Sequence, residues 1–176
     1  RWPLMCFNGA KNWQLGWYED KTIELYNIAS CGPWKGRLYG YVDYSLVADG
    51  YVIIKVGEIH IQFNKISRIN EDTMEMRNMV AFTQSSDGFG PQSWSLAGLE
   101  TGSWDYKDIV VDVCRKSTDA SGLDYFDIVV RNHAQSSRCL NQKYTPSEQC
   151  HSKTSSPSKL PTQQPTPQPS PIPTRF

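Results

Sequence analysis

The chain has no excess of charge of either sign and no long apolar run. Its 176 residues contain 18 Lys and Arg residues and 18 Asp and Glu residues, so the formal net charge is +0 at pH 7. Without a positive field we expect no nucleic acid partner, because such binding depends on many contacts between cationic side chains and phosphates. No stretch approaches the roughly 18 apolar residues of a membrane-spanning helix, so we expect no membrane partner.

Histidine is scarce, and the sequence motifs of common hydrolases are absent. None of the three histidines, His60, His133 and His151, has a second His or a Glu at the spacing of a zinc-binding helix. The sequence also contains no Gly-x-Ser-x-Gly motif that would mark a serine nucleophile. We therefore assign no catalytic residue and no metal ligand to this chain.

The five cysteines form no Cys-x-x-Cys pair, which argues against a zinc ribbon and favours disulfides formed in an oxidising compartment. One expected bridge joins Cys6 to Cys31. The second joins Cys114 to either Cys139 or Cys150. This cysteine usage predicts a secreted or extracellular protein.

A short helix over residues 9–15 is the first element that the sequence predicts. Asn8 can cap it, because the side-chain oxygen can accept a hydrogen bond from an amide of the first turn. Gly16 suits the left-handed residue that ends a helix. Three residues at spacings of three and four predict one buried face: Ala10, Trp13 and Trp17.

Behind this helix the chain is a series of short strands separated by turn signals. Alternating or β-branched residues predict strands over 22–28, 36–44, 51–56, 59–64, 78–84, 94–99, 108–113 and 124–131. The turn at Gly57-Glu58 predicts a β-hairpin, and a loop is expected over residues 115–122. The pattern predicts a mostly β protein, with an antiparallel β-sandwich-like domain preceded by one short helix.

The composition changes at about Lys143. Ser, Thr, Gln and Pro dominate from there on, and a segment of this kind cannot bury enough apolar area to offset its ordering entropy. We expect residues 143–176 to be a disordered Pro-rich C-terminal tail. Residues 165–173 place proline at every second position, which favours polyproline II. A linker, a cell-wall spacer and a glycosylated stalk remain open as its role.

Aromatic residues are abundant, with six Trp and nine Tyr. Aromatic side chains exposed on a β-sandwich can stack on sugar rings or on proline-rich chains. Trp94 and Trp104 flank a Gly-containing stretch over residues 97–103, and we take them as candidate exposed binding residues.

The run Cys-Phe-Asn-Gly-Ala-Lys-Asn-Trp-Gln-Leu-Gly-Trp-Tyr, Cys6 to Tyr18, resembles the segment behind the active site in gametolysin-like zinc metallopeptidases of the metzincin group. A weaker similarity continues to about Asn141. The residues that match the family motif are Asn8, Ala10, Lys11, Leu15, Gly16 and Trp17. The resemblance implies that residues 1–20 are the closing helix segment of a metallopeptidase-like catalytic domain and that residues 21–142 are a separate β-rich domain.

In that family, three histidines of a His-Glu-x-x-His-x-x-Gly-x-x-His signature hold zinc, and the Glu activates the metal-bound water. This signature is absent here. The resemblance therefore implies the C-terminal portion of a secreted zinc metallopeptidase that acts on extracellular or cell-wall proteins, with the upstream catalytic portion missing from this chain. On that hypothesis the chain alone is inactive and holds no cofactor, and zinc belongs to the full-length enzyme.

The alternative hypothesis is a non-catalytic extracellular β-module that binds matrix polysaccharide or glycoprotein. Under the metallopeptidase hypothesis the predicted helix would pack against a partner layer that this chain lacks. An exposed apolar face around Trp13 and Trp17 would follow, with poor solubility of the isolated chain.

Overall fold

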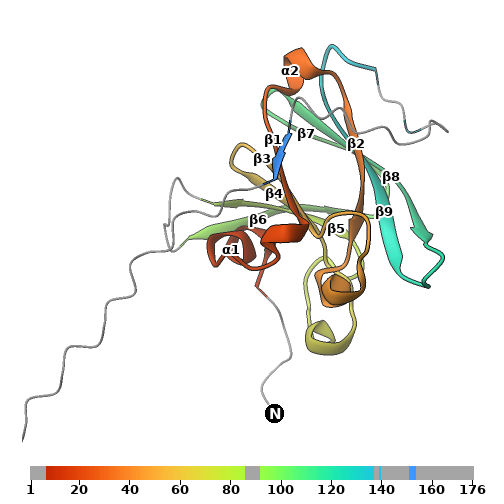
Figure 1. The fold of residues 1–176 in the computed structure, drawn as a ribbon. Helices are drawn as coiled ribbons and strands as arrows, with labels where there is room; N and C mark the ends of the chain where they lie inside the picture. The colour runs from red at the N-terminus through yellow and green to blue at the C-terminus, as the bar shows by residue number, and fades with distance from the viewer. Residues whose placement is uncertain (1–6, 86–91, 137–138, 140–150, 154–176) are drawn as a thin grey trace, which may run out of the picture.

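Two β-sheets lie face to face, with short helices around them (Figure 1). This computed structural model describes residues 7–85, 92–136 and 139, and the backbone of residues 151–153. The six-stranded sheet has the order β10-β1-β3-β4-β5-β6, and the four-stranded sheet has the order β2-β9-β8-β7. All neighbouring strands run antiparallel except β1 and β3, which are parallel. The predicted mostly β, sandwich-like fold is confirmed.

The elements have the following bounds. The six-stranded sheet contains β10 (His151–Lys153), β1 (Thr22–Leu25), β3 (Ile53–Val56), β4 (Ile59–Phe63), β5 (Val80–Ser85) and β6 (Ser93–Leu99). The four-stranded sheet contains β2 (Trp34–Tyr39), β9 (Asp124–Asn132), β8 (Ile109–Thr118) and β7 (Gly102–Tyr106). The helices are α1 (Gly9–Gln14) and α2 (Ile28–Cys31), and the 3-10 turns are η1 (Glu19–Lys21), η2 (Tyr41–Leu46) and η3 (Arg68–Asn70).

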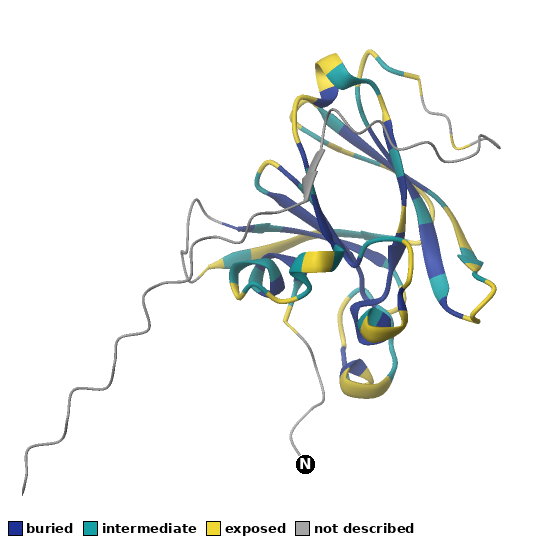
Figure 2. Cartoon of the chain, in the orientation of Figure 1, coloured by how far each residue is buried: buried dark blue, intermediate teal, exposed yellow. Residues whose placement is uncertain are grey.

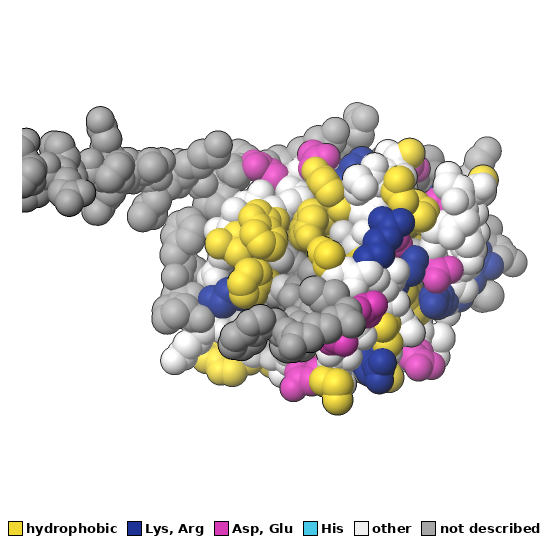
Figure 3. Space-filling model, turned by 90° about the horizontal axis from the view of Figure 1, so that it is seen from below, with side chains coloured by type: hydrophobic (Ala, Val, Ile, Leu, Met, Phe, Trp, Pro, Cys, Tyr) yellow, Lys and Arg dark blue, Asp and Glu magenta, His cyan; other side chains and the backbone are white. Residues whose placement is uncertain are grey.

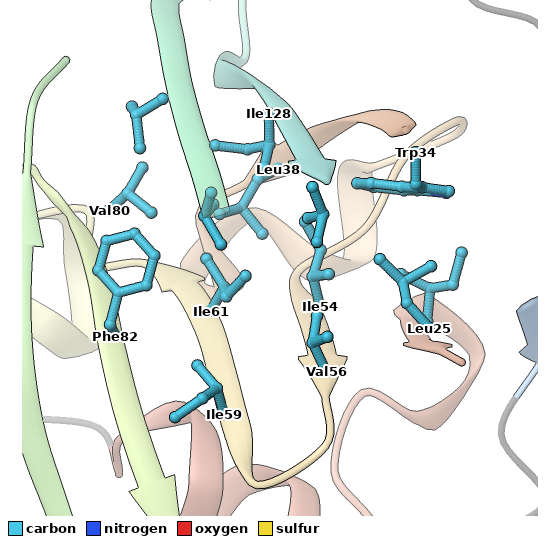
Figure 4. Close-up of a cluster of buried hydrophobic side chains, with 14 of the residues drawn as sticks. Leu25, Trp34, Leu38, Ile54, Val56, Ile59, Ile61, Val80, Phe82 and Ile128 are labelled. Carbon is cyan, nitrogen blue, oxygen red and sulfur yellow. The ribbon is translucent and has the colours of Figure 1, made fainter. Parts of the chain in front are cut away.

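The main core fills the space between the two sheets (Figures 2 and 4). Strand β4 shows how the sequence pattern produces it, because successive side chains of a strand point to opposite faces. Ile59, Ile61 and Phe63 point into the core, whereas His60 and Gln62 point to the outer face of the sheet. All five residues of β4 are buried, so both faces of this sheet are covered here.

Helix α1 covers the outer face of the six-stranded sheet over β4 and β5 (Figure 1). The backbone amide of Ala10 donates to Thr83 Oγ1 at 3.3 Å, and Asn8 Nδ2 donates to Ser93 Oγ at 2.9 Å. Gly9 permits the close approach, since a Cβ there would lie 3.0 Å from Gln62 Oε1. The layer that covers the buried side of α1 is therefore the sheet of this chain. The boundary at residue 20 stays a prediction, and α1, which precedes it, packs on strands that follow it.

The β3–β4 hairpin forms as predicted, with Val56 paired to Ile59 around Gly57, whose φ of 57° suits glycine. Other strand boundaries differ from the prediction. The first strand ends at Leu25, and Asn27 has a φ of 51° immediately before α2. The predicted loop over residues 115–122 is shorter, because β8 continues to Thr118 after a register shift between Val113 and Arg115.

Two strands were not predicted. Strand β7 pairs with β8 in the four-stranded sheet, with Trp104 opposite Val111. Strand β10 lies within the segment predicted as a tail and pairs antiparallel with β1. Apart from residues 151–153, the predicted tail lies outside the described residues.

A disulfide joins Cys114 on β8 to Cys139, as one of the two predicted alternatives. It closes a stretch of 25 residues. Cys31 is also disulfide-bonded, and the other half of that bond lies outside the described residues. Cys6, the predicted partner of Cys31, likewise lies outside the described residues, as does Cys150.

The outer face of the four-stranded sheet contains a buried ion pair. Arg131 Nε donates to Asp112 Oδ2 at 2.8 Å, and Arg131 Nη2 donates to Asp112 Oδ1 at 3.2 Å. The Ser103 hydroxyl also donates to Asp112 Oδ1, at 2.6 Å. The hydrogen bonds to Asp112 raise the pKa of Arg131 above its ordinary value. The pair therefore joins β7, β8 and β9.

Candidate binding surface

The end of α1 determines where the aromatic side chains of the opening segment point. Asn8 Oδ1 accepts a hydrogen bond from the Lys11 amide at 3.1 Å, so the predicted N-cap is present. Gly16 has a φ of 69° and terminates the helix in the left-handed conformation, as predicted. Beyond Gly16 the helical period no longer applies. The side chain of Trp17 consequently lies in solvent and is 47% exposed.

The single buried face predicted for this helix is only partly present. Ala10 is fully buried against the sheet. Trp13 is half-buried, with its ring 5.3 Å from the ring of His60 and 4.4 Å from Lys55 Nζ. Trp17 leaves this face, because the backbone reverses at Gly16. Of the other motif residues, Lys11 Nζ donates to Gln14 Oε1 at 2.8 Å, and Leu15 is exposed.

Trp17 belongs to a continuous run of aromatic rings. Its ring centroid lies 5.8 Å from that of Phe7 and 6.5 Å from that of Tyr18. Tyr18 continues the run to Tyr44 at 4.9 Å and to Tyr41 at 6.2 Å. We call Phe7, Trp17, Tyr18 and Tyr44 the aromatic surface. Phe7 is 54% exposed, whereas Tyr18 and Tyr44 are partly exposed.

The inner end of the aromatic surface is held by the second core cluster of the fold. Tyr41 is buried there, and its hydroxyl donates to Asn64 Oδ1 at 3.2 Å. The carbonyl of Tyr18 accepts a hydrogen bond from the hydroxyl of Thr22, the first residue of β1, at 2.8 Å. This bond holds the Tyr18 backbone beside the start of the strand. These contacts fix the Tyr41 ring and the Tyr18 backbone, and the rings of Tyr18 and Tyr44 pack against the same cluster.

Polar groups border the rings. The Tyr44 hydroxyl donates to Asp20 Oδ1, and this hydrogen bond raises the pKa of Tyr44 above its ordinary value. Asp20 is exposed. Viewed from below, the molecule shows hydrophobic side chains gathered on this face with acidic and basic side chains around them (Figure 3). The face therefore offers flat apolar rings together with hydrogen-bonding groups.

The two tryptophans proposed from the sequence lie elsewhere. Trp94 is 45% exposed on β6, at one edge of the six-stranded sheet. Trp104 on β7 is half-buried, in contrast to the exposed position predicted for it. Its ring stacks on Phe82 at 4.4 Å and on Tyr106 at 5.5 Å, so it packs against the main core. The structure does not bring Trp94 and Trp104 into ring contact with the aromatic surface.

A buried polar layer lies between α1 and the sheet. His60 is fully buried, and burial, together with the charge of Lys55, lowers its pKa to about 3, although the Glu58 and Thr83 backbone partly opposes this. The ring is therefore neutral at ordinary pH. Buried side-chain atoms without a hydrogen-bond partner among the described residues cluster here: Asn12 Oδ1, Trp13 Nε1, both His60 ring nitrogens and Gln62 Oε1. His60 has no access to a substrate in solution.

The two described histidine side chains, those of His60 and His133, do not supply the imidazole set that zinc would need. Among the described residues, no group of three or more His, Cys, Asp or Glu side chains is arranged to hold a metal ion. His60 lies under α1, and the exposed His133 contacts the Lys107 carbonyl through Nε2 at 3.0 Å. The donor set present in the described part of the chain therefore does not fit the three-imidazole site of the metallopeptidase family.

Three residues of the aromatic surface were not predicted from the sequence as binding residues. Phe7 and Tyr18 flank the predicted helix, and their aromatic character at both of its ends was an available signal. Tyr44 was assigned to a strand over residues 36–44, whereas the chain turns into η2 after Tyr39 and brings Tyr44 to Tyr18. This approach of residues 26 positions apart has no local sequence signal.

No protein family, curated protein or solved structure matched the chain in comparisons with known proteins. Within the described residues, no helix has the length and apolar character required to cross a bilayer. The aromatic surface and the resemblance of residues 6–18 are therefore the features of the chain that bear on its function.

Proposed function

We propose that this chain is a non-catalytic extracellular β-module whose aromatic surface binds the carbohydrate of a matrix polysaccharide or glycoprotein. The observation that supports the proposal is the run of rings from Phe7 through Trp17 and Tyr18 to Tyr44. Its outer members are about half exposed, although burying a ring of this size against protein is worth several kcal/mol, about 25 cal/mol for each Å². Exposed aromatic rings grouped in this way are typical of binding surfaces.

The chemistry of the surface suits sugar rings. A pyranose ring has an apolar face of C–H groups that packs on an aromatic ring, and it has hydroxyls around its edge. Asp20 and the hydroxyl of Tyr44 lie beside the rings and can exchange hydrogen bonds with such hydroxyls. Because the backbone of Tyr18 is held at the start of β1 and its ring packs against the second core cluster, this residue loses little conformational entropy when a ligand stacks.

Secretion is part of the proposal. Its support is the Cys114–Cys139 bond and the bonded state of Cys31, since disulfides persist in oxidising compartments. The partners that we propose are accordingly extracellular or cell-wall proteins and glycoproteins.

A second proposal is that the module is the C-terminal portion of a gametolysin-like zinc metallopeptidase. It is favoured by the motif residues around α1, where Asn8 caps the helix, Gly16 ends it and Trp17 is left in solvent. A catalytic domain that precedes the module would then lie close to Trp17. Coding sequence upstream of Arg1 that contains His-Glu-x-x-His would support this proposal, and a start codon with a signal peptide directly before Arg1 would contradict it.

The binding proposal is tested by affinity electrophoresis of the full chain through gels that contain soluble β-glucan, soluble galactan or a neutral matrix glycoprotein. We expect retardation in at least one gel. Replacement Trp17→Ala should weaken it about tenfold, equivalent to about 1.4 kcal/mol. Trp94→Ala removes a tryptophan of equal exposure and should leave retardation unchanged. Equal retardation of the wild type and both variants, or none in any gel, would contradict the proposal.

A further inference from the structure

The register of β10 determines where the last part of the chain begins. Lys153 lies opposite Ile23 and His151 lies opposite Leu25, so β10 runs back towards the start of β1. At that end of β1, the Thr22 hydroxyl donates to the Tyr18 carbonyl at 2.8 Å. The end of β10 is therefore close to the aromatic surface in the fold, although more than 130 residues separate Lys153 from Tyr18 along the chain.

The sequence that follows Lys153 has the composition of an aromatic-binding ligand. Residues 165–173 read Pro-Thr-Pro-Gln-Pro-Ser-Pro-Ile-Pro, with proline at every second position. No Asp or Glu occurs in residues 154–176, so nothing there repels Asp20 at the border of the aromatic surface. The 12 residues from Lys153 to Pro165 can span up to about 40 Å when extended, at 3.3–3.6 Å for each residue.

Proline-rich chains and exposed aromatic rings are complementary. The pyrrolidine ring stacks on an aromatic face, and a polyproline II segment loses little conformational entropy on binding because its backbone is already restricted. With proline at every second position and three residues in each turn, every face of the polyproline II helix carries prolines. Many registers can then bind equally, which suits a surface that consists mainly of rings.

We propose that residues 165–173 dock in cis on the aromatic surface and compete there with the carbohydrate ligand. The competition rests on the proposed function, because that function supplies the carbohydrate ligand. The docking of the tail does not depend on it. A tether of this length gives residues 165–173 an effective concentration on the order of 1 mM at the aromatic surface. If the segment binds with a dissociation constant of about 1 mM, it is docked in about half of the molecules. The tail then sets the affinity of the module for its matrix ligand.

The test uses the full chain labelled with ¹⁵N at its tryptophan indoles. In the comparison variant, the five prolines at 165, 167, 169, 171 and 173 are replaced by alanine. The indole N–H signal of Trp17, assigned with Trp17→Phe, should differ between the wild type and the variant, because docking places pyrrolidine rings on it. The Trp94 signal should not differ, since β6 lies at the opposite edge of the six-stranded sheet from β10. Coincident Trp17 signals would overturn the proposal.

A peptide of residues 165–173 provides the second measurement. Added to the five-proline variant, it should move the Trp17 signal towards the wild-type position and leave Trp94 unchanged. The chemical shift of the Trp17 indole signal in the wild type should not depend on protein concentration. A shift that appears only when the protein is concentrated would mean that the tail binds a second copy of the chain, and it would overturn docking in cis.

Carbohydrate binding by the wild type and by the five-proline variant distinguishes failure of the tail docking from failure of the proposed function. The carbohydrate that retards the chain most in affinity electrophoresis should bind the five-proline variant about twofold more tightly than the wild type, because a millimolar intrinsic affinity of the tail leaves about half of the wild-type surfaces occupied. Equal carbohydrate affinity of the two chains would overturn the competition and leave the binding function intact. Peptide-dependent shifts without affinity for any carbohydrate would support docking and contradict the proposed function.

Discussion

At the residue scale, the surroundings of a side chain decide its role more than its type does. Trp13 and Trp17 are four positions apart, yet Trp13 packs beside His60 and Lys55 whereas Trp17 is exposed. The difference arises at Gly16, where the positive φ reverses the chain between them. Two individual groups, His60 and Asp112, give testable consequences for stability.

Stability should depend on pH through His60. Its pKa is about 3 in the folded protein, below the ordinary value of 6.5, so the unfolded state binds the proton first. The contribution of neutral His60 is complete above pH 6.5 and is lost progressively as the pH falls towards 3, at up to about 1.4 kcal/mol for each pH unit. Denaturant unfolding from pH 7.5 to 5 measures this slope.

Replacement His60→Leu removes the titrating group and should flatten the dependence between pH 6.5 and 5. The exposed His133 provides the control, and His133→Gln should keep the wild-type slope. Identical slopes for wild type and His60→Leu would show that His60 is accessible to protons in the folded protein.

Removal of the Asp112 carboxylate should destabilise the fold strongly. Asp112→Ala leaves the guanidinium of Arg131 largely buried without its partner, at a cost on the order of 3 kcal/mol. The double variant Asp112→Ala/Arg131→Leu should recover part of this loss, because no unpaired charge remains. Asp127→Ala breaks the exposed pair with Arg115 and should have little effect on the free energy of unfolding. Equal effects of Asp112→Ala and Asp127→Ala would contradict a structural role for the buried pair.

At the element scale, local sequence rules predicted the elements that local interactions determine. The β3–β4 hairpin, the cap at Asn8 and the helix end at Gly16 all follow from a few neighbouring residues. Strand β10 depends on pairing with β1, more than 120 residues away, and no local pattern indicates it.

The same distinction applies to the candidate site. The exposure of Trp94 could be proposed from composition and spacing, but the aromatic surface requires Tyr44 to reach Tyr18 through η2. Trp104 was misplaced because its stacking on Phe82 joins the two sheets across the core, which depends on tertiary structure.

The N-cap of α1 can be separated into two contributions. Asn8→Ala removes both the acceptor for the Lys11 amide and the donor to Ser93, and it should lower the free energy of unfolding by about 1–2 kcal/mol. Asn8→Asp keeps the acceptor and loses only the donor, so its loss should be smaller. Urea unfolding of the wild type and the two variants measures the contributions of the acceptor and the donor. Equal losses of the free energy of unfolding in Asn8→Ala and Asn8→Asp would show that the acceptor for the Lys11 amide does not stabilise the protein.

At the scale of the whole molecule, a disulfide and helix α1 connect segments that are not paired within a sheet. The Cys114–Cys139 bond ties the segment after β9 back to β8, and α1 covers the sheet over β4 and β5. Helix α1 and the described strands β4 and β5 therefore pack directly against each other.

Thiol counting tests the covalent part of this description. The Cys114–Cys139 bond and the bond of Cys31 occupy four of the five cysteines, so denatured, non-reduced protein should react with one equivalent of a thiol reagent. Reduction breaks both bonds, and loss of the Cys114–Cys139 bond alone should lower the free energy of unfolding by about 3 kcal/mol. Five reactive thiols before reduction would contradict both the bonds and the proposed extracellular location.

Oxidative footprinting of the tryptophans, with and without the carbohydrate that retards the chain most in affinity electrophoresis, tests whether the aromatic surface is the binding site. N-bromosuccinimide oxidises exposed indoles, and mass spectrometry of peptides gives the rate for each position. Trp17 and Trp94 are similarly exposed among the described residues, so in the free protein their rates should agree within about twofold, with Trp17 the slower because the docked tail covers it in about half of the molecules. Saturating carbohydrate should protect Trp17 at least fivefold and leave Trp94 unchanged. Protection of Trp94 instead, or of neither residue, would contradict the assignment of the aromatic surface as the binding site.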